Sequence, residues 1–228
     1  MAAGMTITLT NVSAVIAAVG ALGTTAFGLV DTFKMLPGGG LSRAGFKFVR
    51  RVILRLAPEV PTFEGTGLSR ESLLYTLQSQ WVNGTSTTDQ VSIAKSLIKL
   101  RLTPGTSDAL AKATGVNPAI LSAVAANLVA GTALTPVQND VYGRFDLLLT
   151  TLLDQAYQRA GQRYRNAAKA VAVPVAVGLA LAAAFLTGDV KPGVAVILGL
   201  IATPIAPIAK DLATGLTTAM QAIQSWKE

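Results

Sequence analysis

The chain has 228 residues, of which 51% are apolar and 14% charged, and it carries a net charge of +7. Soluble domains are usually about 25% charged, so this composition favours a membrane protein. The sequence contains no cysteine and no histidine, which excludes disulfides, thiolate chemistry and the usual ligands of zinc, haem and iron–sulfur clusters. We therefore expect no metal and no cofactor, and the scattered carboxylates favour a protein that is not an enzyme.

The first expected element is a membrane helix near the N-terminus, and we assign residues 1–34 to it. Residues 7–30 include no charged residue. At about 1.5 Å per residue this run gives about 36 Å of helix, enough to cross a hydrocarbon core of about 30 Å. No lysine or arginine precedes the run, so it does not resemble a cleavable signal peptide.

One face of this helix consists of small side chains that recur at helical spacing. In lipid, small residues let helix backbones approach closely, so the face predicts helix association. The partner is either another helix of the same chain or a second copy of it, and the sequence leaves both open. The face comprises Ser13, Ala17, Gly20, Ala21, Thr24, Thr25 and Gly28.

A basic amphipathic helix is expected next, within residues 35–58. Its cations fall within an arc of about 140°, opposite an aromatic and aliphatic face. This pattern is typical of a helix that lies in the headgroup plane of a bilayer, where anionic lipids attract basic residues. The alternative is a domain helix with solvated charges. The predicted lipid contacts here are Arg43, Lys47, Arg50, Arg51 and Arg55.

Residues 59–169 are expected to form a helical cytoplasmic domain. Capping and helix-breaking residues delimit helices over about 69–83, 88–102, 107–114 and 118–130. A last helix begins at Pro136 and continues into the second membrane segment. No period-two pattern indicates strands. The predicted fold class is therefore an all-α integral membrane protein, with three membrane helices and a helical domain.

Two short motifs in this domain have simple structural explanations. Residues 109–124 are spaced like a helix-turn-helix, but the second helix has no lysine or arginine for DNA, so nucleic acid is an unlikely partner. Ser92-x-x-Lys95 and Ser96-x-x-Lys99 match the spacing of some acyl-enzymes. Two consecutive copies on one helix favour a solvated surface instead.

Two more apolar runs, 170–187 and 192–209, flank a short polar turn and predict a membrane hairpin over residues 170–209. Pro204 and Pro207 interrupt the second run, which either spans the bilayer or re-enters it. Residues 210–228 are expected to form an amphipathic tail. Basic flanks stay in the cytoplasm, so the N-terminus should lie outside and the central domain and C-terminus inside. The flank before the hairpin is also predicted to contact lipid, through Arg159, Arg163, Arg165 and Lys169.

The residues around the hairpin resemble a known family. Leu153-Asp154-Gln-Ala-Tyr-Gln-Arg159-Ala-Gly161-Gln-Arg-Tyr164-Arg165, followed by Gly188-Asp189-Val190, is similar to a widespread family of uncharacterised bacterial membrane proteins. That family has an N-terminal membrane helix, a helical cytoplasmic segment and a C-terminal hairpin. Its Phe, Trp and Asn-Val-Asp turn are here Leu153, Arg163 and Gly-Asp-Val. The resemblance implies a bacterial inner membrane location and no activity.

These patterns predict a non-enzymatic membrane scaffold or accessory subunit that self-associates as a homo-oligomer or joins a larger membrane complex. The expected partners are membrane lipids with anionic headgroups. An oligomeric pore or transport component is the alternative, suggested by the proline-broken third segment. A membrane-tethered DNA-binding protein is a lesser alternative.

Overall fold

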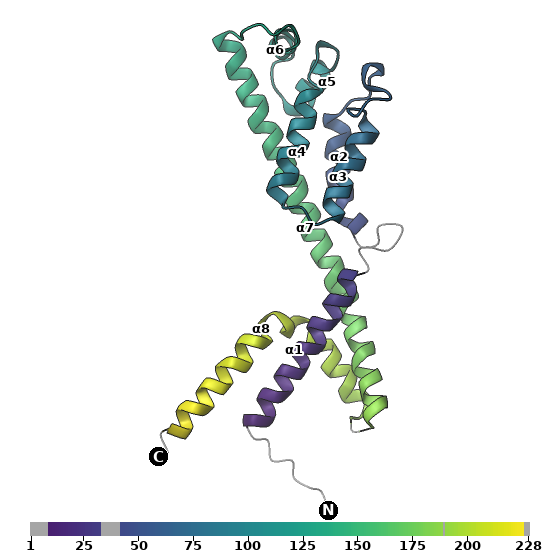
Figure 1. The fold of residues 1–228 in the computed structure, drawn as a ribbon, viewed down its shortest axis with the longest axis vertical. Helices are drawn as coiled ribbons and strands as arrows, with labels where there is room; N and C mark the ends of the chain where they lie inside the picture. Colours follow the sequence, from purple (N-terminus) through teal and green to yellow (C-terminus); the bar gives the residue numbers. More distant parts are fainter. Residues whose placement is uncertain (1–8, 33–41, 189, 226–228) are drawn as a thin grey trace, which may run out of the picture. The chain divides into compact units, whose positions relative to one another are not determined.

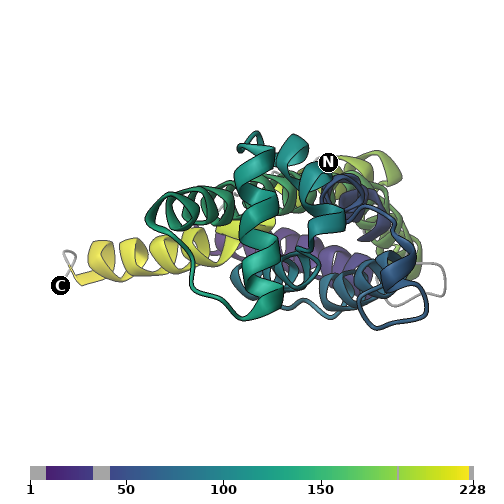
Figure 2. The same ribbon diagram turned by 90° about the horizontal axis from the view of Figure 1, so that it is seen from above.

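A computed structural model describes residues 9–32, 42–188 and 190–225, and within these ranges every regular element is a helix (Figures 1 and 2). This confirms the predicted all-α class. A short 3₁₀ turn, η2 (Pro61–Phe63), precedes α3. The α-helices are α1 (Leu9–Thr32), α2 (Ser42–Leu56), α3 (Arg70–Val82), α4 (Thr87–Leu100), α5 (Pro104–Thr114), α6 (Pro118–Ala130), α7 (Pro136–Thr187) and α8 (Pro192–Ser225).

Local capping chemistry explains most helix boundaries. The Asn117 side chain accepts a hydrogen bond of 3.1 Å from the Ile120 N–H and so starts α6. Gly115 ends α5 with φ +74°, a left-handed conformation that favours glycine. One helix start differs clearly from the expectation: α5 begins at Pro104 instead of residue 107. Proline is favoured in the first turn of a helix, where its missing N–H has no intrahelical partner to lose.

The chain divides into two compact units, which we call terminal and central. The terminal unit comprises residues 1–36 and 165–228, and the central unit comprises residues 37–164. The long helix α7 contributes residues to both. Its 52 residues correspond to about 78 Å of helix, more than twice the thickness of a hydrocarbon core. The part of α7 that is apolar enough to cross a membrane is its charge-free end, residues 170–187.

Among the described residues three helices are long and apolar enough to cross a membrane, and all three contribute to the terminal unit. α7 continues without a break from Pro136 through Pro174, as predicted. α8 contains both Pro204 and Pro207 and is bent in Figure 1. It also extends past residue 209 into the expected tail, so the hairpin and the tail share one helix. Most side chains of that tail, and residues 226–228 altogether, lie outside the described part of the chain.

Glycines permit the closest helix contacts of the terminal unit. A Cβ added to Gly23 of α1 would lie 2.2 Å from the Ala202 carbonyl oxygen of α8, and one on Gly20 would lie 2.2 Å from the Ala209 Cβ. The alanine repeat of α7 is buried in the same unit. Small residues thus bring the helices close enough for van der Waals packing, as expected in lipid. The buried alanines are Ala172, Ala176, Ala180 and Ala184.

We predict that Gly23→Val weakens this packing by about 2 kcal/mol, because the new side chain overlaps the α8 backbone. Thermal unfolding of the full chain in mild detergent measures the loss. Gly178→Val is the matched control, since a Cβ on Gly178 meets nothing within 4 Å. Equal losses in both variants would show that the α1–α8 contact is not responsible.

The central unit is built around one hydrophobic core to which α2 to α7 all contribute. α2 packs against α3 and α5, and α3 packs against α4. The apolar face of α2 belongs to this core, which bears directly on its expected role at a lipid surface. The most deeply buried members include Val49, Ile53, Leu73, Leu77, Ile98, Leu110, Leu121, Phe145, Leu149 and Leu153.

Candidate functional site

The small side chains of α1 lie on two different sides of the helix. Gly20 faces α8, together with Val19, Gly23 and Ala26, all of them buried. The other described members of the predicted association face are exposed, so they are not used for packing within the chain. The side chain of Ser13 lies outside the described part. The exposed members are Ala17, Ala21, Thr24, Thr25 and Gly28.

The exposed side of α1 is smooth over much of its width. Ala14 and Ala18 are also exposed there, and a Cβ on Gly28 would meet nothing within 4 Å. Larger side chains, Val15 and Leu29, lie at one margin of this side. The Thr24 hydroxyl donates to the Gly20 carbonyl at 2.9 Å, so its hydrogen-bonding need is met inside the helix. We call Ala14, Ala17, Ala18, Ala21, Thr24, Thr25 and Gly28 the small face of α1.

The basic residues of α2 are all exposed, whereas its apolar face is buried. Phe46, Val49, Ile53 and Leu56 are each at most 5% exposed within the central core. Burial of each such side chain stabilises the fold by roughly 1.5–3 kcal/mol. Turning this face into lipid would remove these side chains from the core and lose that stabilisation. The structure therefore differs from the expected helix with its apolar face in the bilayer. Contact between the cations and lipid remains a prediction.

A glycine brings α2 directly against α7. A Cβ on Gly45 would lie 2.6 Å from the Ala160 carbonyl oxygen and 2.9 Å from the Trp81 ring. That ring also packs near Tyr157 and Tyr164, with centroid distances of 6.3 and 6.5 Å. Burial raises the pKa of the Tyr157 hydroxyl, which stays protonated at neutral pH. This contact holds the N-terminal end of α2 in a fixed position on α7.

Basic residues gather around this junction from both helices. The structure places Arg159 and Arg163 of α7 in exposed positions within a turn of Ala160. Arg165 and Lys169, also exposed, continue the series on α7 within the terminal unit. We call the exposed cations of α2, together with Arg159 and Arg163 of α7, the basic surface: Arg43, Lys47, Arg50, Arg51, Arg55, Arg159 and Arg163.

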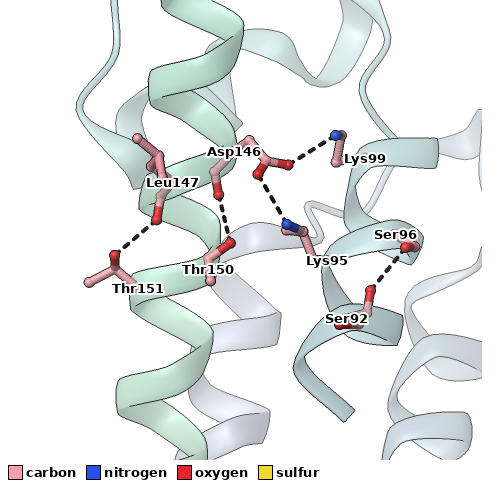
Figure 3. Close-up of polar contacts among 8 residues, drawn as sticks. All are labelled: Ser92, Lys95, Ser96, Lys99, Asp146, Leu147, Thr150 and Thr151. Atoms are coloured by element: carbon pink, nitrogen blue, oxygen red, sulfur yellow. Dashed lines mark hydrogen bonds and ion pairs between the residues drawn. The ribbon is translucent and has the colours of Figure 1, made fainter. Parts of the chain in front are cut away.

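The lysines of the two Ser-x-x-Lys motifs bind a carboxylate rather than the serines (Figure 3). The ammonium groups of Lys95 and Lys99 lie 3.0 and 2.9 Å from the two carboxylate oxygens of Asp146 on α7. Ser96 donates instead to the Ser92 carbonyl at 2.9 Å. Partial burial alone would lower the pKa of Lys99, but its hydrogen bonds to Asp146 and Tyr142 outweigh burial and raise it. A lysine that acts as a general base needs a lowered pKa, so Lys99 is not suited to that role. The ion pairs with Asp146 instead join α4 to α7.

We predict that Asp146→Asn lowers the free energy of unfolding by about 1 kcal/mol at pH 7. Burial acts to raise the pKa of Asp146, but hydrogen bonds from Lys99 and Lys95 outweigh it and lower the pKa. The stabilisation is therefore present above the ordinary carboxyl pKa and is lost as pH falls through the lowered value. Denaturation of the full chain in mild detergent between pH 3 and 8 tests this.

Asp140→Asn is the matched control, because Asp140 is exposed on the same helix. The stabilisation by this ion pair extends to alkaline pH, because the raised pKa of Lys99 keeps its ammonium group charged there. A difference between D146N and wild type that persists unchanged at pH 3 would contradict the ion-pair explanation.

A pocket of about 440 Å³ lies on the central unit between residues 59–72 and Arg101. Arg101 is fully buried, donates to the carbonyls of Pro58 and Leu68 and lies 4.6 Å over the Phe63 ring. Burial, and then the nearby charge of Arg70, lower the pKa of Arg101. Arg70 itself pairs with Glu59. Both cations that line the pocket thus hold the loop in place, a role that no sequence pattern indicated.

The helix-turn-helix spacing is used for packing. Ala111, Val116 and Leu121 are buried between α5 and α6. The exposed side of α6 carries alanines together with Leu128 and Val129. Because α6 has no lysine or arginine, it offers no charged donor to a DNA phosphate.

The chain matches no family model, no curated protein and no solved structure. The resemblance of residues 153–190 to a bacterial membrane family therefore remains a prediction. What is established is a helical protein whose apolar helices, near both ends of the chain, indicate membrane association. The small face of α1 and the basic surface are the two exposed surfaces through which this protein could contact a partner.

Proposed function

We propose that this protein is a non-enzymatic integral membrane scaffold or accessory subunit that self-associates, or joins a larger membrane complex, through the small face of α1. The observation that carries the proposal is the separation of the two sides of α1. One side packs on α8 through Gly20 and Gly23, whereas the small face is exposed, with only Ala18 at its edge lining a pocket beside Ala180 and Ala184 of α7.

Membrane helices associate by close packing, because lipid tails are as apolar as the side chains they would replace. Small residues are enriched where such helices approach each other. In α7 the alanine repeat is already occupied by the chain's own packing. In α1 the small face is not covered in this way, and a second copy of the chain would present a face of the same shape. A symmetric homodimer would follow from that self-complementarity.

The proposed location is a bacterial inner membrane, with the N-terminus outside and the central unit and C-terminus in the cytoplasm. Arg165 and Lys169 precede the apolar end of α7, and Lys191 lies between the hairpin segments. This asymmetry supports the orientation under the positive-inside rule. The similarity of residues 153–190 to the bacterial family supports the choice of membrane. Membrane lipids with anionic headgroups are the proposed small partners.

We predict that Ala17→Leu with Ala21→Leu and Gly28→Leu converts the oligomer to a monomer. Three bulky side chains on the small face prevent close backbone contact, and the dissociation constant should rise at least about tenfold. Sedimentation velocity of the full chain in a density-matched detergent reports the change.

Val15→Leu is the control, because it adds bulk at the margin of the small face, where a larger side chain already stands. The helical circular dichroism signal of both variants should equal that of the wild type, since neither variant touches α8, whereas loss of the oligomer can itself lower the unfolding temperature. A wild-type protein that sediments as a monomer at all concentrations, with no co-purifying subunit, would sink the proposal.

A second candidate, an oligomeric pore or transport component, is favoured by one feature of α8. Thr203 is 5% exposed and its hydroxyl has no hydrogen-bond partner. Pro204 and Pro207 lack the N–H groups that would otherwise bond to carbonyls one turn earlier. Polar groups freed at a broken membrane helix line the ion sites of several transporters. A membrane-tethered DNA-binding protein is the lesser candidate, because α6 lacks cations.

If the second candidate is right, proteoliposomes should pass K⁺ or protons faster than protein-free liposomes, and Thr203→Val should reduce that flux several-fold. Thr187→Val is the control, because the Thr187 hydroxyl bonds within its own helix, to the Ala183 carbonyl at 3.0 Å. Flux at the protein-free level would remove this candidate.

A further inference from the structure

The basic surface carries an excess of positive charge that the central unit does not neutralise. None of its seven cations forms an ion pair with another residue in the described ranges. α2 contains no acidic residue, and the nearest carboxylate along α7 is that of Asp154, five positions before Arg159. Uncompensated charge of this density attracts anions from solution or from a nearby surface.

The helix α2, which carries five of these cations, is held in a fixed position by its packing. The apolar side of α2 is buried among α3 and α5, and Gly45 lies against the Ala160 backbone. α2 therefore cannot roll its apolar side into a bilayer while the central unit stays folded. Only its charged side is available to a partner.

The chemistry of the surface favours phosphate. Six of its seven cations are arginines, and a guanidinium donates two parallel hydrogen bonds to a phosphate group, which an ammonium cannot do. Along α7 the series of cations continues through Arg165 and Lys169 to the charge-free run at residue 170. Cations that precede a proposed membrane segment by so few residues in the sequence meet phosphates as lipid headgroups.

Nucleic acid is the other common source of ordered phosphates, and the aromatic residues where α2 meets α7 argue against it, whereas the exposed Tyr75 belongs to α3. Single-stranded binding surfaces expose aromatic rings for base stacking. Beside this surface Tyr157 is buried and Trp81 is packed against Gly45 and two tyrosines.

We infer that the basic surface binds the phosphate groups of anionic lipid headgroups by charge and hydrogen bonding alone, while α2 stays packed in the central unit. The inference rests on the proposed membrane location and is independent of self-association. It assigns α2 to an electrostatic docking role in place of insertion. The lipid contact should therefore weaken as salt rises.

Isothermal titration of the full chain in neutral detergent tests the inference, with dihexanoyl phosphatidylglycerol and dihexanoyl phosphatidylcholine as probes. Wild type should bind the anionic lipid more tightly than the zwitterionic one, and 0.5 M salt should weaken that binding. The triple variant Lys47→Gln, Arg50→Gln, Arg51→Gln should bind the anionic lipid about 100-fold more weakly. A control that removes the same charge elsewhere, Lys112→Gln, Arg144→Gln, Lys191→Gln, should bind like wild type.

Circular dichroism shows whether the triple variant has kept its fold. If it has not, the single variant Arg50→Gln replaces it, and its affinity for the anionic lipid should fall about fivefold. Three results would overturn the inference: unchanged affinity in the α2 variant, equal affinity for both lipids, or tighter binding of a single-stranded RNA. Inorganic phosphate that displaces the lipid at equal concentration would identify a free-phosphate site and overturn the headgroup assignment. Sedimentation of the same samples reports self-association separately, so a monomer that still binds lipid refutes only the proposed oligomer.

Discussion

The uninterrupted helix α7 is the constraint on which both units depend. Over its first part Phe145, Leu149 and Leu153 are buried in the central core. Over its last part the buried ridge changes to alanines, from Ala172 to Ala184. The change is the one expected of a helix that passes from water into lipid. In water, large apolar side chains stabilise a core by leaving the solvent, whereas in lipid that gain disappears and small residues allow close packing instead.

The same physics separates the two sides of α1. Glycines on one side bring α1 to van der Waals contact with α8, as the missing Cβ atoms at Gly20 and Gly23 show. Small residues on the other side have no such contact in a single chain. In a bilayer this second side offers close packing that remains unused until another helix covers it. Self-association is therefore the proposal that makes use of both sides.

The basic surface illustrates why amphipathic periodicity is ambiguous. Residues 43–56 show one charged and one apolar face, and the pattern is equally typical of a helix on a bilayer and of a helix on a protein core. Packing of Val49 and Ile53 with the central core decides the question for the apolar side. The charged side is left exposed, and its partner is decided by charge and by the position of α2 against α7.

The sequence by itself determined the helical class, the three apolar segments and most helix ends, because these depend on local properties: charge-free length, capping side chains and helix-breaking residues. The sequence places the beginning of α5 too late because proline is typical both after the end of a helix and in the first turn of one, and Pro104 is the first residue of α5. Only the tertiary structure decided which sides of α1 and α2 are covered, that Asp146 meets Lys95 and Lys99, and that Arg101 is buried. Those contacts join residues that lie far apart in the chain. The periodicity of a sequence indicates whether a helix face is apolar, small or charged, but it does not indicate which element packs against that face.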